Sequence, residues 1–231
     1  MVKAHYERLF IENADTVVTI NETCSKLLAF GNRNIGKLKI IENGYDDIAI
    51  DTLNRQGETR VNGKVVFVYP GKFYNDLNPG RFLEIIFGKD HVNDFSFSYV
   101  GSDSSTIDEF NNVTNHGAKD YQSTIEIINS CDIGLIFTGG KPFESTTKIF
   151  DYIGLEKAIL IITNGKVRTG NLHNITSNYP KIYWAENNES AIVSVLEQIK
   201  GDELQVDYQE KHKYSRREGL KKLIEIIQDD T

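Results

Sequence analysis

The sequence predicts an α/β fold built on a doubly wound, Rossmann-like parallel sheet. Short apolar runs, which are typical of buried parallel strands, alternate with helical patterns at least six times along the chain. The clearest unit covers residues 131–163, where Ile133–Phe137 and Ala158–Ile162 are apolar runs on either side of a helical pattern. A strand, loop, helix and strand of this length form the crossover that a pair of parallel strands needs.

The composition supports a folded chain and excludes two classes of partner. The 231 residues are enough for one large or two small domains, and 39% hydrophobic residues can fill a core. The net charge of −7 argues against a broad nucleic-acid-binding surface. No apolar run approaches the ~18–20 residues of a membrane-spanning helix, so we expect no direct membrane insertion.

The compartment expected from the sequence is the cytoplasm. Residues 1–15 are charged and lack the apolar stretch of a signal peptide. Cys24 and Cys131 flank different elements, and we expect both to be buried thiols in a reducing environment. The acidic balance gives no support for a basic membrane-docking face, so a peripheral position at the inner face of a membrane would depend on a part of the protein outside these residues.

The first 63 residues predict two helix–strand pairs and then a polar loop. In chain order we expect a helix at Val2–Asn13, a strand at Asp15–Ile20, a helix capped by Asn21 and a strand at Lys37–Ile41. Leu27 and Leu28 should form the buried side of the second helix. We interpret Asp46-Asp47 as a solvated turn rather than a metal site, and Ile48–Gly63 as a loop.

The remaining residues predict the strands and helices of the main sheet. Besides the unit at 131–163, strands are expected at Lys64–Tyr69, Asp94–Val100, Asn111–Asn115 and Lys181–Trp184. Helices are expected around Phe82–Phe87 and at Asp120–Ser130, Asn187–Ile199 and Tyr214–Gln228. The stretch 164–177 is rich in Gly and Asn and should be a surface loop.

The corner at residues 144–151 has the chemistry of an anion site. A helix should begin near Ser145, with Ser145 or Thr146 as its cap. Backbone N–H groups at the helix start and Lys148 in the first turn can bind a phosphate. Asp151, three residues on, can accept hydrogen bonds from the hydroxyls of a ribose. The spacing therefore suits a nucleoside diphosphate, and the alternative is a solvated ion pair.

The same residues carry a family resemblance. The run from Ser145, S-T-T-K-I-F-D-Y-I-G-L-E-K-A-I-L, resembles the signature of the donor-binding lobe of GT-B glycosyltransferases, especially the family-4 type (glycosyl transferases group 1). That family often reads S-x-x-K-[LI]-F-E-Y-[ML]-A-x-G-K-P-[IV]-[IL] at this place. Lys148 matches its lysine and Asp151 its ribose-binding carboxylate. Glu144 resembles the catalytic first carboxylate of the family's E-x7-E pair, although the spacing is one residue short.

Further motifs extend the resemblance over nearly the whole chain. The pieces Ala14-Asp15 and Ile41–Asp46 stand where the family reads A-D and V-I-P-N-G-V-D. The family's V-x-[FW]-x-G segment and its glycine turn line the base pocket, and the residues in those places are Gly101, His116 and Gly117.

The resemblance also implies a site for the donor diphosphate. The glycine of its first loop lets the backbone approach a ligand, and a basic residue follows. The second cation of that loop is absent, because Leu77 and Asn78 stand in its positions. The residues we assign to the diphosphate are Gly71, Lys72, Thr146, Thr147 and Lys148.

The function implied is that of one half of a two-lobed enzyme. Such an enzyme moves a sugar from a nucleoside-diphosphate sugar to a saccharide or lipid-linked acceptor, as in polysaccharide biosynthesis, usually with retention and without a metal or other cofactor. We expect residues 1–231 to be a single nucleotide-sugar-binding domain with 214–228 as its closing helix, inactive without an N-terminal lobe that holds the acceptor. The alternatives are a sugar-nucleotide epimerase lobe and a non-catalytic nucleotide-binding module. The sequence does not determine the base, sugar, acceptor or oligomeric state.

Overall fold

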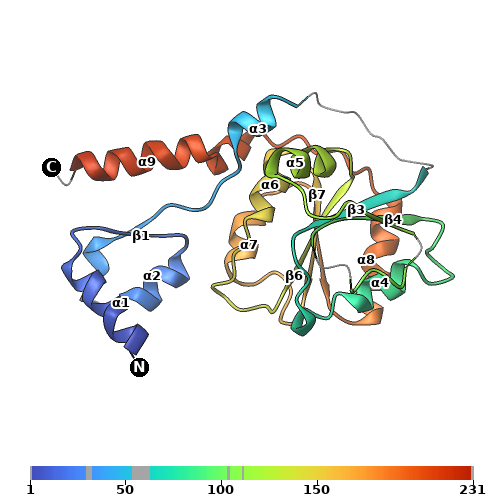
Figure 1. Cartoon of the computed structure of the whole chain (residues 1–231), viewed down its shortest axis with the longest axis horizontal. Helices are drawn as coiled ribbons and strands as arrows, with labels where there is room; N and C mark the ends of the chain where they lie inside the picture. Colours follow the sequence, from blue (N-terminus) through green and yellow to red (C-terminus); the bar gives the residue numbers. More distant parts are fainter. Residues whose placement is uncertain (1, 30–32, 54–62, 103–104, 111, 230–231) are drawn as a thin grey trace.

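The computed structural model describes residues 2–29, 33–53, 63–102, 105–110 and 112–229, whose strands form two parallel sheets (Figure 1). The smaller sheet pairs β1 (Val17–Thr19) with β2 (Leu38–Ile40). It lies with α1 (Val2–Asn13) and α2 (Glu22–Leu28) on one side of the molecule, away from the larger sheet. No helix in these ranges has the length and apolarity to cross a bilayer.

The larger sheet has the strand order of a Rossmann fold. Its six strands run parallel in the order β5-β4-β3-β6-β7-β8, which reverses direction between β3 and β6. Ligands of such sheets bind beyond the carboxyl ends of the strands at this reversal, the switch point. The predicted fold class is therefore confirmed. The strands are β3 (Val65–Pro70), β4 (Phe95–Val100), β5 (Val113–Asn115), β6 (Ile133–Thr138), β7 (Ala158–Thr163) and β8 (Ile182–Glu186).

Helices cover both faces of the larger sheet, so its central strands are buried from end to end. One apolar core lies under α4 (Gly80–Ile86) and α8 (Glu189–Gly201). The other lies under α5 (Tyr121–Asn129), α6 (Lys148–Gly154) and α7 (Gly170–Thr176).

Two segments that cross between the sheets lie side by side, and we call residues 41–47 and 214–217 the crossing segments. The backbone N–H of Tyr45 donates to Tyr214 O (3.0 Å), and that of Arg216 donates to Tyr45 O (2.9 Å). Gly44 permits this approach, because a Cβ there would lie 2.6 Å from Tyr214 O. After the 3₁₀ helix η4 (Gln209–Tyr214), α9 (Arg216–Asp229) extends toward the side that carries the smaller sheet (Figure 1).

The predicted loops at 48–63 and 164–177 are both wrong in part. The first holds α3 (Asp47–Asp51), and its stretch 54–62 lies outside the described residues. Asp46 caps α3, since its Oδ1 accepts from the N–H groups of Ile48 and Ala49, so Asp46-Asp47 is not simply a solvated turn. The second loop holds α7, whose Asn171 N–H donates to Pro142 O (3.0 Å). Both helices depend on contacts that a local pattern does not reveal.

The burial predicted near the N-terminus is also wrong for two residues. Leu27 is 62% exposed, because nothing among the described residues covers that side of α2. Cys24 is only partly buried for the same reason, whereas Cys131 is buried and both thiols are free.

Tyr152 joins α6 to the switch point of the larger sheet. Its side chain is fully buried, and its hydroxyl donates to Leu135 O at 3.1 Å, with Val68 O at 3.4 Å. These carbonyls belong to β6 and β3, the two strands on either side of the reversal. The ring lies against Gly134, where a Cβ would be 2.4 Å from ring carbons.

We predict that Gly134→Ala destabilises the fold by about 2 kcal/mol or more, because the buried ring has no room to move away. Urea unfolding of the altered and unaltered chains measures the difference. Gly201→Ala on α8 is the matched control, since a Cβ there meets nothing within 4 Å. Equal losses in the two variants, or none at Gly134, would contradict the packing described.

Candidate functional site

The predicted site residues gather at one edge of the larger sheet. Lys72 follows β3, Gly101 follows β4 and His116 follows β5. The corner at 144–151 follows β6. All of these strands are parallel, so their carboxyl ends share an edge, as the sequence predicted.

Gly71 and Lys148 meet at the switch point. Gly71 has φ +100°, and its N–H donates to Val100 O (2.7 Å). A Cβ at Gly71 would lie 3.4 Å from Lys148 Cε and 3.5 Å from its Nζ. Lys148 Nζ also lies 4.7 Å from the centre of the Tyr69 ring, a cation–π contact. Burial lowers the pKa of Lys148 and the nearby Asp151 opposes that change, so a partly buried cation stands beside open backbone.

Lys72 and Gly101 differ in what they can offer a ligand. The side chain of Lys72 is exposed, and its carbonyl accepts from the Tyr69 hydroxyl (3.1 Å). A Cβ at Gly101 would lie 2.3 Å from Tyr99 Oη and 2.6 Å from Gly71 O. Gly101 therefore lets two loops of the site pack together, and its predicted place beside the base stays a prediction.

Neutral groups hold the positions where the family has its second cation. Asn187 Nδ2 donates to Leu77 O (2.7 Å) and reaches Asn78 O at 3.4 Å. Asn78 has φ +46°, a left-handed conformation that asparagine tolerates. The nearby Arg81 donates to the carbonyl of Asn187. The segment is thus braced by amides, and its arginine is used to hold the loop after β8.

Asp151 lies on the same helix as Lys148, one turn further along. Its Oδ1 accepts a 2.7 Å hydrogen bond from the Tyr121 hydroxyl. Burial raises the pKa of Asp151 to about 6. The hydrogen bond from Tyr121 and the charges of Arg216 and Lys148 act in the opposite direction, while Asp46 adds to the rise. Asp151 is therefore ionised at neutral pH, but its pKa lies only about one pH unit below neutrality.

Glu144 is tied to its own loop. One of its oxygens, Oε2, accepts from Gly140 N–H (3.0 Å) and from the Thr138 hydroxyl. A Cβ at Gly139 would lie 2.9 Å from Oε1. The carboxylate is half-buried at the end of β6, and the catalytic role implied for it stays a prediction.

The predicted start of the corner helix is wrong. α6 begins at Lys148, and its cap residue is Thr147, so neither Ser145 nor Thr146 caps it. Thr147 already has helical angles (φ −64°, ψ −28°), whereas a capping side chain needs an extended backbone to reach the free N–H groups. Thr146 and Thr147 stay available as neutral donors next to Lys148.

His116 and Gly117 form the far end of the candidate site. Ser98 Oγ lies 2.7 Å from His116 Nε2, and the backbone N–H of His116 donates to Tyr99 O (2.9 Å). Burial, with Lys119 adding to it, lowers the pKa of His116. A neutral imidazole suits a wall beside a base, and Gly117 has φ +67°, a left-handed conformation that favours glycine.

The sequence did not reveal several side chains that lie against these residues or their neighbours, including Ser98 on His116. They come from elements distant in the chain, and no local motif marks them. The others are Tyr69 under Lys148, Thr138 on Glu144, Tyr121 on Asp151, and Arg216 beside Tyr121.

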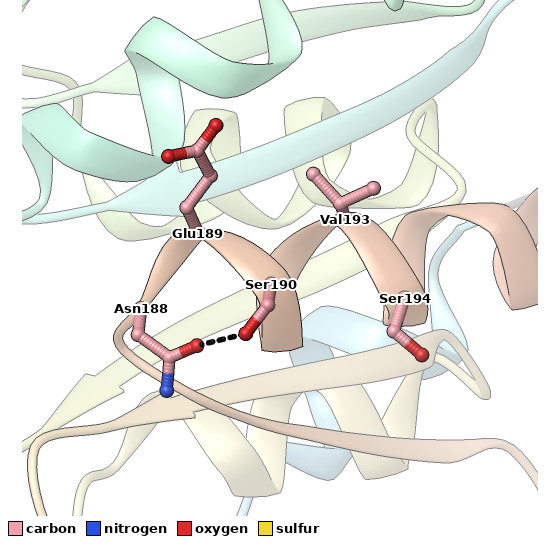
Figure 2. Close-up of a pocket in the computed structure, with 5 residues that line it drawn as sticks. All are labelled: Asn188, Glu189, Ser190, Val193 and Ser194. Atoms are coloured by element: carbon pink, nitrogen blue, oxygen red, sulfur yellow. Dashed lines mark hydrogen bonds between the residues drawn. The ribbon is translucent and has the colours of Figure 1, made fainter.

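A hollow opens at the start of α8, the helix that follows β8 (Figure 2). It is lined by one carboxylate and by small polar and apolar side chains, with Asn188 Oδ1 accepting from the Ser190 hydroxyl (2.9 Å). Its lining residues include no cation for a phosphate. In the described part of the chain, no group of three or more His, Cys, Asp or Glu side chains is arranged to hold a metal.

Solved structures resemble this chain along almost its entire length. HepE from Anabaena, in complex with UDP and glucose, has a TM-score of 0.70 at 10% identity, over 98% of this chain and 66% of that chain. Sucrose-phosphate synthase from Thermosynechococcus elongatus has a TM-score of 0.67 at 12% identity, over 99% and 61%. UDP-GlcNAc 2-epimerase from Methanocaldococcus jannaschii, in complex with UDP-GlcNAc and UDP, has 0.59 at 10% identity, over 93% and 61%.

These likenesses show the fold, which is that of a GT-B lobe with a Rossmann-like sheet. No protein-family model matches the chain, and a search of curated proteins found no match. The chain spans 61% to 66% of the length of these three structures, so at least a third of each has no counterpart here.

We predict that Asp151→Asn stabilises the chain at neutral pH. The folded pKa of about 6 lies above the ordinary value of 3.8, so the carboxyl's contribution to stability is full below that ordinary value and is lost as pH rises through the folded pKa. The amide mimics the protonated form, and because Asp151 is only partly shielded we expect a gain of about 1 kcal/mol near pH 7.5 and none near pH 3.5.

Urea unfolding of both chains across this pH range measures the effect. The control is Asp120→Asn, because hydrogen bonds from Ser123 lower the pKa of Asp120 and reverse the expected sign. A gain at Asp151 that does not change with pH would contradict the account of its burial.

Proposed function

We propose that this chain is the nucleotide-sugar-binding part of a glycosyltransferase. The observation that carries the proposal is the placement of Lys148 and Asp151 on α6 at the switch point, with Lys148 Nζ beside the backbone of Gly71. This gives a cation for a diphosphate, a carboxylate for a ribose and a glycine that permits close approach. HepE was solved with UDP and with UDP-glucose, so a uridine nucleotide is the first ligand to test.

This part of the enzyme would contribute to catalysis by electrostatic stabilisation. When the glycosidic bond to the donor breaks, negative charge develops on the leaving diphosphate, and cations placed there in advance stabilise it. Lys148 is partly buried against Tyr69, where charges interact more strongly than in water. Lys72, Thr146 and Thr147 would add a second, more exposed cation and two hydroxyl donors.

The sugar and the base would lie on opposite sides of the diphosphate. Glu144, held at the end of β6, would face the sugar. Gly101, His116 and Gly117 would line the base, since burial favours the neutral imidazole of His116. We further propose retention at the anomeric carbon, no required metal, and an acceptor that is a saccharide or is lipid-linked, in the cytoplasm.

A second lobe would complete the enzyme and hold the acceptor. Most of the exposed large apolar side chains among the described residues lie on the smaller sheet, its helices and α9. Such a surface is unusual for a free face and is typical of one that packs on another domain. Its members are Tyr6, Leu9, Phe10, Val18, Ile20, Leu27, Ile35 and Ile40 in the N-terminal part, and Leu220, Ile224 and Ile227 on α9.

We predict that this chain binds one of UDP, GDP and ADP, with UDP favoured, and that Lys148→Ala and Asp151→Ala each weaken binding at least ~10-fold. Loss of Lys148 removes the charge at the diphosphate, and loss of Asp151 removes the acceptor for the ribose hydroxyls. Isothermal titration calorimetry measures both effects. Lys26→Ala is the control, because that lysine pairs with Glu22 on α2. Binding that survives both site substitutions would overturn the proposal.

We also predict that the 231-residue chain alone does not transfer sugar, because the acceptor site lies on the second lobe. The measurement is UDP release and product formation from UDP-glucose with added acceptor saccharides. Transfer by this chain would show that its own residues complete the active site.

One neighbour supports a second candidate function. The Methanocaldococcus jannaschii epimerase has the same fold and was solved with UDP-GlcNAc and UDP. An epimerase lobe would present the same donor contacts, so binding does not separate the two functions. Release of free sugar together with UDP from UDP-GlcNAc, with no acceptor present, would favour the epimerase.

A further inference from the structure

Arg216 is held on the crossing segments by contacts from both its side chain and its backbone. Its Nη1 pairs with Asp46 Oδ2 at 2.9 Å, and its Nε donates to Gly44 O at 3.2 Å. Its backbone N–H donates to Tyr45 O at 2.9 Å. The guanidinium therefore follows the position of these segments, which connect the larger sheet with the smaller sheet and α9.

The same guanidinium contacts a residue of the candidate site. Arg216 Cζ lies 5.4 Å from the centre of the Tyr121 ring, within the range of a cation–π contact. Tyr121 begins α5, directly after the capping residue Asp120, and its hydroxyl donates to Asp151 Oδ1 at 2.7 Å. Contacts therefore run without a break from the crossing segments through Arg216 and Tyr121 to Asp151.

We propose that Tyr121 and Arg216 are positioning residues that link the crossing segments to the ribose-binding carboxylate, so that nucleotide affinity depends on where those segments lie. The inference rests on the proposed nucleotide site and deepens it. Neither residue needs to touch the nucleotide. Tyr121 fixes the plane of the Asp151 carboxylate by using Oδ1, which leaves Oδ2 for the ribose hydroxyls.

Electrostatics strengthens the link. The charged and titratable groups that act on Asp151 are Lys148 on α6, Tyr121 on α5, Arg216 on α9 and Asp46 in the crossing segment. The first three favour the ionised carboxylate, and Asp46 opposes it. Loss of Arg216 would remove one favourable charge and would also leave Asp46 without its ion-pair partner. Asp151 would then take up a proton at higher pH and lose acceptor capacity for the ribose.

The link works in both directions. If a movement of the crossing segments weakens nucleotide binding, a bound nucleotide must favour the position of the segments described here by the same free energy. Because the crossing segments join the two sheets, donor binding would favour one placement of α9 and the smaller sheet over others.

The test measures UDP affinity in Tyr121→Phe and Arg216→Gln by calorimetry between about pH 5.5 and pH 8. We expect each variant to bind ~5-fold more weakly near pH 6.5 and the deficit to shrink toward pH 8, because deprotonation restores the carboxylate. The double variant should lose less than the two single losses combined, since one contact joins the residues. Arg8→Gln on α1, whose guanidinium pairs with Glu12, is the control and should bind like the unaltered chain.

The outcomes separate this inference from the proposed function. Lack of nucleotide binding by the unaltered chain would overturn the function, and equal binding by every variant would overturn only the link. A carbon-13 NMR titration of the Asp151 carboxyl decides the link without any nucleotide. A pKa that rises in both Tyr121→Phe and Arg216→Gln supports the link, and an unchanged pKa overturns it.

Discussion

The position of the candidate site depends on the packing of Tyr152 into the switch point. α6 has only seven residues, too few to be stable by itself, so tertiary contacts must hold it. Tyr152 provides them by placing its ring against Gly134 and its hydroxyl between carbonyls of β3 and β6. Ile149, Phe150 and Ile153 bury the same helix in the core. With those four side chains fixed, Lys148 and Asp151 have little freedom in where they project.

The strands and most helices were predictable from the sequence because apolar periodicity reports burial directly. Ile133–Phe137 and Ala158–Ile162, both read from apolar runs alone, differ from β6 and β7 by one residue. Errors came where the deciding contact is distant in sequence. α7 forms where Gly170 and Asn171 meet Pro142. α6 begins only at Lys148, and its cap residue Thr147 has helical angles and makes no side-chain capping hydrogen bond. The local sequence pattern predicts neither the formation of α7 nor the first residue of α6.

For the candidate site too, the sequence could indicate residues within one local motif but not their contacts with distant parts of the chain. Lys148 and Asp151 were chosen because a phosphate and a ribose need a cation and a carboxylate one helical turn apart, and the structure places both on α6 at the switch point. The residues that contact Lys148 and Asp151 could not be identified from the sequence. Tyr69 and Tyr121 act on them through contacts that exist only after the sheet and its helices have assembled.

The absence of a second cation has a counterpart in the structure. Asn187 joins three loops at the edge of the sheet, donating to Leu77 O and to Asn164 Oδ1, while Arg81 donates to its carbonyl. The amide of Asn187 and the guanidinium of Arg81 thus hold together the segment in which the sequence lacks the expected second cation. In the proposed complex, more of the diphosphate's charge would therefore be neutralised by Lys148, whose partial burial would strengthen that interaction.

Asp151 differs from the chain's structural carboxylates in what the fold gains from it. Asp120 caps α5 and Asp132 accepts from Val66 N–H, so both are needed by the backbone around them. Asp151 accepts from a tyrosine hydroxyl and is shielded enough for burial to oppose its charge. Burial of a carboxylate that is ionised at neutral pH opposes stability, and such groups occur often at functional sites, which supports the ribose contact that we propose for Asp151. The same argument applies to Lys148, whose cation is also opposed by burial and stands one turn away at the switch point.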